Sequence, residues 1–331
     1  MAKENDVRGA QEDREQTLLP PTSRRGFMEC MAWAGAGLVW SLSGGVLSSR
    51  ALAEVARAEA GGAPGARRSG GLHFVQISDT HIGFDKDANP DPVATAREAI
   101  ARIDALADEP AFVLHTGDLT HAQKPGAFDT VAGLLQEARV GGVFTVPGEH
   151  DVFSDGGKEY LARFGRGTQG SGWQSFDHGG AHFVGLVNVL GFQNANVGAL
   201  GAEQIAWLER DVAGLSSSTP VVVFAHIPLW AVYPEWGWAT DDGAQALGVL
   251  KRFGSVTVLN GHIHQVLQKT EGNVTFHSAL STAYPQPAPG TAKGPGPLKV
   301  PAEELRTHLG LREVTWHGKP GPLVVVDSKL G

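Results

Sequence analysis

Cysteine is almost absent from this sequence of 331 residues, which contains a single one, Cys30. That residue lies in an N-terminal segment that we expect to be removed, for the reasons given below. The remaining chain would then form no disulfide, although the surroundings of an exported protein permit one. Its stability must come from a buried core and from any metal that it binds.

Basic residues are scarce relative to acidic ones. Lys and Arg total 27 against 35 Asp and Glu, which gives a net charge of −8 with neutral histidine. Proteins that grip a nucleic-acid duplex need a surplus of Lys and Arg on one face, because those charges displace counterions. The composition therefore argues against a nucleic-acid duplex as a partner.

Long apolar runs are limited to one, near the N-terminus, that approaches the roughly 20 residues needed to cross a bilayer. A protein with several membrane spans is therefore excluded. Because 42% of the residues are apolar, a wholly disordered chain is excluded as well. The length suits one large domain with a tail, or two small domains.

The single apolar run has the layout of a secretory signal. A polar leader precedes a Gly/Ala-rich apolar stretch at 31–47, and the small residues Ala51-Leu52-Ala53 follow it. We expect cleavage after Ala53, so that residues 1–53 form a signal peptide. An uncleaved membrane anchor is the alternative, although four glycines dilute the apolar stretch.

The pair Arg24-Arg25, with Phe27 two residues later, resembles the twin-arginine (Tat) export signal. That pathway carries proteins that have already folded. The resemblance implies the Tat translocon as a partner during export and a periplasmic or other extracytoplasmic location, with no permanent membrane span.

After the signal, the chain changes from a spacer to a patterned domain. Residues 54–71 are rich in Ala, Gly and Arg without an apolar period, which predicts a flexible linker. Residues 72–331 form the predicted domain, in which the Pro/Gly-rich segment 284–301 is expected to be a long surface loop.

Short apolar runs alternate with amphipathic stretches throughout this domain. The predicted strands are 72–78, 111–115, 142–146, 181–189, 220–226, 256–260, 274–277 and 323–327, and the predicted helices are 92–106, 127–138, 202–215 and 244–253, with a short helix after Pro301. Such alternation predicts an α/β fold whose sheets are covered by helices.

Histidine and carboxylate residues follow the buried strands. The five strand endings are Asp79 with His81, Gly117-Asp118, Gly148-Glu149-His150-Asp151, His226, and Gly261-His262-Ile263-His264. Ligands of open α/β sheets bind at the carboxyl ends of the strands, so these groups should converge on one small volume. A lone buried histidine is more often part of the core, but a pocket that gathers this many imidazole and carboxylate groups is costly to bury without a cation.

Mixed nitrogen and oxygen donors of this number suit a pair of metal ions. Mn, Fe or Zn fits such donors better than Ca, which prefers oxygen ligands alone. Two metal ions about 3.5–4 Å apart are a recurring device for hydrolysing phosphate esters. We therefore expect two metal ions per chain and a small phosphate ester as the substrate.

Taken in order, these five motifs resemble the signature of the calcineurin-like metallophosphoesterases, especially the branch that contains bacterial cyclic-nucleotide phosphodiesterases. The resemblance runs from about Leu72 to about Leu280. It implies a four-layer α/β/β/α sandwich with a dinuclear metal site between the two sheets, at the C-terminal ends of the strands.

The resemblance also implies a role for each motif residue. The first metal ion would be held by Asp79, His81 and His264, the second by His226 and His262, and Asp118 would bridge the two. His150 would lie beside the ions, either protonating the leaving oxygen or steadying the phosphate. Asp151 would orient His150.

Glu149 departs from the family pattern, which has a neutral Asn ligand of the second metal ion at this position. A carboxylate can also bind the ion, but it raises the ligand charge from −2 to −3 and would make the centre a weaker Lewis acid. Three outcomes remain open: an equivalent oxygen ligand, an altered choice of metal or substrate, and loss of hydrolytic activity.

Other polar and aromatic residues are candidates for substrate contacts. His121 follows the Gly117-Asp118 turn and could reach the pocket, whereas His115 lies within an apolar strand and fits the core better. The segment 228–238 carries Trp230, Tyr233, Trp236 and Trp238 directly after His226, and Trp230 and Tyr233 are the candidates for substrate contacts. It is either a structural lid or an aromatic wall for a flat group such as a nucleobase.

The sequence thus predicts an exported, metal-dependent phosphoesterase, with phosphodiesters favoured over monoesters. A phosphomonoesterase or nucleotidase is the alternative within the enzyme class. A metal-binding envelope protein silenced by Glu149 is the alternative outside it.

Overall fold

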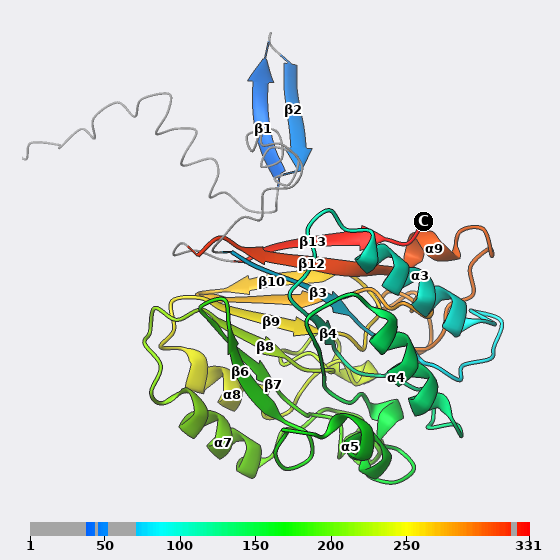
Figure 1. Cartoon of the computed structure of the whole chain (residues 1–331), viewed down its shortest axis with the longest axis horizontal. Coiled ribbons are helices and arrows are strands. Elements are labelled where there is room, and N and C mark those ends of the chain that lie inside the picture. The colour runs from blue at the N-terminus through cyan, green and yellow to red at the C-terminus, as the bar shows by residue number, and fades with distance from the viewer. Residues whose placement is uncertain (1–37, 44–45, 52–70, 319–322) are drawn as a thin grey trace, which may run out of the picture. The chain divides into compact units, whose positions relative to one another are not determined.

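The computed structural model describes residues 38–43, 46–51, 71–318 and 323–331 (Figure 1). The chain divides into two units, Met1–Ala66 and Arg67–Gly331. In the first unit, strands β1 (Leu38–Ser43) and β2 (Val46–Ala51) pair in antiparallel fashion.

The expected export features fall largely outside the described residues. Arg24-Arg25, the cleavage point after Ala53 and the linker up to residue 70 all lie there. Among the residues that the structure does describe, no helix is both long and apolar enough to cross a membrane.

The first sheet of the second unit combines the first three strands of that unit with its last two. Its five strands run in the order β13-β12-β3-β4-β5. The central strand β3 (Leu72–Ile77) pairs in parallel with β4 (Val113–His115), which pairs in parallel with β5 (Val143–Thr145). On the other side of β3 lie the antiparallel strands β12 (Gly310–Trp316) and β13 (Val324–Lys329).

The second sheet has six strands in the order β10-β11-β9-β8-β7-β6. Its inner four are parallel: β11 (Val274–Ser278), β9 (Val256–Asn260), β8 (Val221–Phe224) and β7 (Ala181–Gly185). Its two edge strands are antiparallel to their neighbours: β10 (Leu267–Glu271) and β6 (Gln174–His178).

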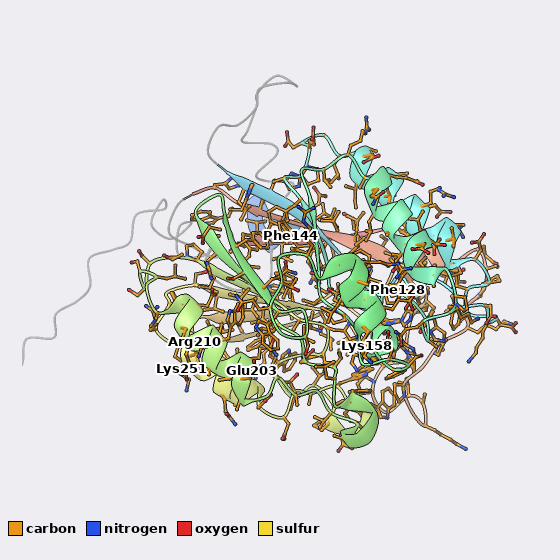
Figure 2. The ribbon with its side chains drawn as sticks, turned by 60° about the horizontal axis from the view of Figure 1, so that its bottom comes forward. Phe128, Phe144, Lys158, Glu203, Arg210 and Lys251 are labelled. Carbon is orange, nitrogen blue, oxygen red and sulfur yellow. The ribbon has the colours of Figure 1, made fainter. Side chains whose placement is uncertain are left out.

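Helices cover the outer face of each sheet. The helices are α3 (Pro92–Asp104), α4 (Ala127–Glu137) and α5 (Lys158–Phe164) in the N-terminal half, α6 (Phe192–Ala195), α7 (Ala202–Val212) and α8 (Gly243–Leu250) in the middle, and α9 (Leu305–His308) near the end. In Figure 2 the charged Glu203, Arg210 and Lys251 project from the α7–α8 layer, on its outer side.

Helix α3 begins at Pro92, directly after Asp91, whose side chain accepts a hydrogen bond from the Ala94 amide.

Successive side chains of the central strands point to opposite faces of their sheet, so they pack into three separate hydrophobic clusters. On β3, Val75 and Ile77 pack with α3 and α4, while Phe74 belongs to a cluster that joins the two sheets. On β8, Val221 and Val223 pack with α7 and α8, while Val222 and Phe224 join the inter-sheet cluster. The central strands of both sheets are therefore buried on both faces, which confirms the predicted four-layer α/β/β/α sandwich.

Every strand and helix expected from the sequence is present, with ends shifted by a few residues, but the sequence reading missed several others. Strands β1, β2, β6, β10 and β12 and helices α5 and α6 were not expected. Strands β6 and β10 are edge strands whose side chains are half-buried or exposed, so they lack the apolar run by which the buried strands were found.

The loop 284–301 contains neither helix nor strand, as expected, but it is not wholly a surface loop. Its first residue, Tyr284, is only 3% exposed. Tyr284 and Gln286, at this end of the loop, line the cavity of the candidate site.

Candidate metal centre

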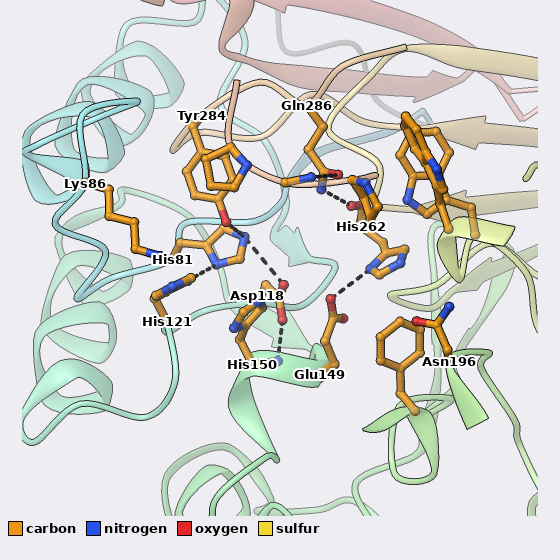
Figure 3. A pocket seen from close by; sticks show the side chains of 16 residues that line it. His81, Lys86, Asp118, His121, Glu149, His150, Asn196, His262, Tyr284 and Gln286 are labelled. Carbon is orange, nitrogen blue, oxygen red and sulfur yellow. Dashed lines mark hydrogen bonds and ion pairs between the residues drawn. The ribbon is translucent and has the colours of Figure 1, made fainter. Parts of the chain in front are cut away.

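The loops that follow the central strands of both sheets meet at one place (Figure 3). The chemistry-bearing residues come from the loops after β3 (Asp79, His81), β4 (Asp118), β5 (Glu149, His150), β8 (His226) and β9 (His262, His264). Parallel strands end at the same edge of a sheet, so the loops after them lie together. This arrangement brings together residues that are as many as 185 positions apart in the sequence, as predicted.

Asp79, His81 and His264 form a first group whose ligand atoms lie within 4.8 Å of one another. His264 Nε2 lies 3.2 Å from Asp79 Oδ1 and 3.3 Å from His81 Nε2. The His262 amide donates to both oxygens of Asp79, at 3.2 Å, which ties the β3 loop to the β9 loop of the other sheet. All three side chains are buried.

Glu149, His226 and His262 form a second group within the same 4.8 Å limit. Glu149 Oε2 lies 2.8 Å from His226 Nε2, and Glu149 Oε1 lies 3.1 Å from His262 Nδ1. Yet Glu149 Oε2, His226 Nε2 and His262 Nδ1 are buried without a partner in hydrogen-bonding geometry among the described residues. Unpaired buried donors and acceptors are costly, and a cation at this point would satisfy all three.

Asp118 lies between the two groups. Its Oδ2 is 3.5 Å from His81 Nε2 in the first group and 3.5 Å from His226 Nε2 in the second. Its other oxygen, Oδ1, accepts a hydrogen bond from the His150 amide at 2.9 Å, which fixes the carboxylate. One carboxylate is thus placed to serve two cations at once.

Backbone carbonyls set the orientation of two histidines. His226 Nδ1 lies 2.7 Å from the Thr116 carbonyl oxygen, and His264 Nδ1 lies 2.6 Å from that of Tyr284. A carbonyl can only accept, so in both rings Nδ1 carries the proton and the Nε2 lone pair faces the centre. This arrangement is typical of metal-binding histidines.

The backbone at the candidate ligands is strained. Five of the seven have a positive φ: Asp79 (54°), His81 (41°), Asp118 (51°), His262 (68°) and His264 (54°). A non-glycine residue in the left-handed region costs about 1 kcal/mol or more, and such residues cluster where function requires a fixed geometry.

Two motif glycines are required because neighbouring atoms leave no room for a Cβ at their positions. Gly117 has a φ of +98°, and a Cβ there would lie 2.5 Å from His226 Nδ1. A Cβ on Gly148 would overlap Asp118 Oδ1 and the Asp118 backbone nitrogen. The glycine before each ligand therefore lets loops from different strands pack against one another.

The electrostatics of the centre fit a cation. Burial and the Glu149 carboxylate raise the pKa of Asp118 well above its ordinary value. Burial alone would lower the pKa of His226, but the carboxylates of Asp118 and Glu149 raise it well above its ordinary value. Both shifts mean that protons supply positive charge when no cation is present, so metal binding should release protons. The donor set thus fits two borderline metal ions.

Asp151 does not orient His150, contrary to the expectation from sequence. Its carboxylate accepts hydrogen bonds from the amides of Leu119, Thr120 and Gly148 and from the Thr120 hydroxyl, at 2.8–2.9 Å. These bonds join the β4 loop to the β5 loop. Asp151 therefore supports the position of Asp118 rather than that of the imidazole beside it in the sequence.

His150 lies against the first group. Its ring stacks on His121, with centroids 4.5 Å apart, and meets His81 edge-on at 5.0 Å. Its Nδ1 is buried and unpartnered among the described residues. Burial lowers the pKa of His150, so in the absence of an anion the ring is neutral at neutral pH. Its distance to Asp118 and Glu149 also falls within ligand range.

A cavity of about 360 Å³ opens above this centre. Its wall includes His81, Asp118, Glu149, His150 and His262 from the centre, together with Lys86, His121, Phe192, Asn196, Trp236, Trp238, Tyr284, Gln286 and the turn 295–297. The expectation that His121 reaches the pocket is thus met by its position.

Trp230 and Tyr233, expected at the substrate, do not line this cavity. Trp230 packs against the core outside the second sheet, beneath the Lys269 ammonium. Tyr233 and Trp238 pair across a tight turn, which brings Trp236 and Trp238 to the cavity instead. The aromatic segment 228–238 therefore does contribute to the cavity wall, through Trp236 and Trp238, but the two residues expected to contact the substrate do not reach it.

His115 is buried and hydrogen-bonded to the Thr80 hydroxyl at 3.1 Å, as expected for a core residue. Sequence reasoning missed Tyr284, Gln286, Phe192, Asn196 and Lys86. None of them follows a buried strand directly, so the strand-end signal could not find them.

Comparison with known proteins supports the assignment of this site as a candidate metal centre. The family model described as calcineurin-like phosphoesterase matches residues 72–266. Over 180 residues the chain is 29% identical to serine/threonine-protein phosphatase CPPED1 of Bos taurus, which covers 49% of this chain and 57% of that protein. It is 25% identical over 224 residues to a probable cyclic nucleotide phosphodiesterase of Rhodopseudomonas palustris, covering 64% and 79%.

Among solved structures, a dimetal phosphatase from Danio rerio has the same fold, with a TM-score of 0.58 and 16% sequence identity. The match covers 77% of this chain and 98% of that one. The chain spans little more than half the length of the bovine relative, so the whole activity of that protein does not transfer to it directly.

Proposed function

Because this chain belongs to the calcineurin-like phosphoesterase family, we propose that it uses two metal ions to hydrolyse phosphodiesters. The family supports a metal-dependent phosphoric ester hydrolase. The observation that carries the proposal is the position of Asp118, whose Oδ2 is 3.5 Å from one nitrogen in each of two ligand groups.

The chain's own residues divide the work as follows. Asp79, His81 and His264 would hold the first ion, Glu149, His226 and His262 would hold the second, and Asp118 would serve both. When bound, the ions would supply Lewis-acid polarisation of the phosphate and a water molecule of lowered pKa.

His150 and His121 act from the cavity wall. The imidazole of His150, with an unpartnered Nδ1, is placed to give a proton to the departing oxygen or to steady the phosphate. Its neighbour His121 contributes a further contact with the substrate. Asp151 holds the loops that place Asp118 and His150, which is a positioning role.

Phosphodiesters are favoured because the motif that carries His150 resembles that of the cyclic-nucleotide branch and because one relative is named as a probable cyclic nucleotide phosphodiesterase. Phosphomonoesters are the second candidate, since the CPPED1 relatives are named as serine/threonine-protein phosphatases. A silent metal-binding protein is the third, because Glu149 adds a negative charge to the centre.

Turnover of bis-p-nitrophenyl phosphate and of p-nitrophenyl phosphate, with Mn, Fe and Zn supplied one at a time, tests these readings. Faster turnover of the diester supports the proposal. Faster turnover of the monoester supports a phosphomonoesterase. No turnover of either ester by protein that has bound metal supports the silent reading.

Glu149→Asn is expected to weaken retention of metal by about tenfold or more while turnover of a diester stays equal or rises. Removing one negative charge beside the second ion reduces its attraction for the cation and increases that for a phosphate anion. Metal affinity by competition with a chelator, together with kcat for the diester, checks this. Glu203→Asn on the exposed face of α7 is the matched control (Figure 2).

Collapse of turnover in Glu149→Asn with both metals retained would contradict this account. Glu149 would then act in the chemistry itself, and its assignment as a ligand would be wrong.

Export by the twin-arginine route is the second part of the proposal, supported by Arg24-Arg25 and Phe27 in the sequence. Folding before export would fix the metal choice inside the cell, where copper and zinc, which bind nitrogen ligands more tightly than Mn or Fe, are not free to compete. Replacing Arg24 and Arg25 by Lys should leave precursor in the cytoplasm, whereas Arg14→Lys should not. Normal export of the double variant would rule the route out.

A further inference from the structure

Tyr284 is held in the centre by three contacts that involve different parts of the residue. Its backbone carbonyl accepts the Nδ1–H of His264 at 2.6 Å. Its ring stacks on His81, with centroids 4.8 Å apart and an interplanar angle of 25°, and packs on Phe84 at 4.4 Å. Because the side chain is only 3% exposed, the hydroxyl has one fixed position.

That hydroxyl lies 3.1 Å from His81 Nε2, its one hydrogen-bond partner among the described residues. The same nitrogen is 3.3 Å from His264 Nε2 and 3.5 Å from Asp118 Oδ2, and so faces the first ligand group. An imidazole nitrogen has a single lone pair. When that lone pair binds a metal ion, Tyr284 loses its acceptor.

A buried hydroxyl without a partner is costly, so the phenol must find another acceptor. Tyr284 lines the cavity with His81, Asp118 and His150, and Figure 3 shows its hydroxyl beside the His81 ring, toward Asp118 and His150. The phosphate of a bound ester is the group that enters this space and carries free acceptor oxygens.

We infer that the Tyr284 hydroxyl donates a hydrogen bond to a phosphoryl oxygen of the ester once His81 has bound the first metal ion. This inference rests on the proposed function and adds to it a residue that contacts the substrate. Tyr284 and His150 then hold the phosphate from two directions, since they come from loops on different sheets.

Tyr284→Phe isolates the hydroxyl. The ring that stacks on His81 and the carbonyl that orients His264 both remain in this variant. The chain has only three tyrosines, and Tyr233, which does not line the cavity, gives the matched control Tyr233→Phe. Thermal unfolding of both variants shows whether the fold is kept.

The probe is inorganic phosphate, titrated by calorimetry into metal-loaded protein, with the metal content measured by elemental analysis. We expect Tyr284→Phe to keep the wild-type metal content and to bind phosphate about tenfold more weakly or worse, because a hydrogen bond to a charged group is lost. Tyr233→Phe should bind phosphate as the wild type does.

Three results would overturn the inference. Wild-type phosphate affinity in Tyr284→Phe would show that the hydroxyl does not contact the anion. Loss of one metal ion from that variant, or a visible phenolate-to-iron absorption band in Fe³⁺-loaded protein that the variant lacks, would make Tyr284 a ligand instead. Failure of the wild type to retain metal is a separate result that would overturn the proposed function itself.

Discussion

Replacing Asp118 by Asn is expected to release both metal ions and to lower turnover of a diester by ~10³-fold or more. The Asp118 Oδ2 lies at the same distance from a nitrogen of each ligand group, so loss of its charge weakens both sites together. The amide oxygen of Asn can still accept the hydrogen bond from the His150 amide, so the loop should keep its shape.

Elemental analysis of the variant after loading and washing, beside kcat for the diester, checks this result. The matched control is Asp129→Asn on α4, where the exposed carboxylate pairs only with Arg163 among the described residues. If Asp118→Asn loses a single ion and keeps the other at full occupancy, the carboxylate does not bridge.

His150→Ala is expected to retain both metal ions but to lower turnover by about 10²–10⁴-fold. The ring lies on the cavity wall, and its backbone amide, which holds Asp118, is unchanged by the substitution. Because burial lowers the pKa of His150 in the free protein, an anionic ester in the cavity is what would favour the protonated ring.

Metal content and turnover measured on the same sample separate the two roles that the geometry allows. His178→Ala, at an exposed position on β6, controls for removal of an imidazole. Loss of a metal ion from His150→Ala would show that His150 is a ligand. Such a role is within reach, because a ligand atom of His150 lies within 4.8 Å of ligand atoms of Asp118 and Glu149.

The place of the metal centre was predictable from sequence because each of its residues follows a buried strand, and some also follow a glycine directly. Asp118, for example, follows a buried strand and comes after a glycine, and the structure shows why both matter. The strand places the side chain at the common edge, and Gly117 allows the close approach of His226. Asp79, His81 and His264 are brought together in the same way.

The role of Asp151 was not predictable, because neighbours in sequence need not touch. The short 3-10 helix Glu149–Asp151 turns the carboxylate of Asp151 toward Leu119 and Thr120, away from the His150 ring. The same limit applies to the aromatic wall. A tight turn that pairs Tyr233 with Trp238 determines which aromatic side chains reach the cavity. That turn could not be predicted from the aromatic content of the segment.

Tyr284 was missed for a different reason. It lies 203 positions from His81 and in a segment without apolar period, which sequence reasoning assigned to the surface. Contacts that form only in the folded chain bring this segment to the centre: the Thr282 amide donates to the Ser78 carbonyl, and the Ser281 hydroxyl donates to the Asp79 carbonyl.

The most direct test of the account is the number of metal ions that the wild-type chain retains. Protein loaded separately with Mn, Fe or Zn, freed of excess metal and quantified by elemental analysis against protein concentration should contain two ions per chain with at least one of these metals. One ion or none with every metal would contradict the central claim that Asp118 joins two ligand groups into a dinuclear site.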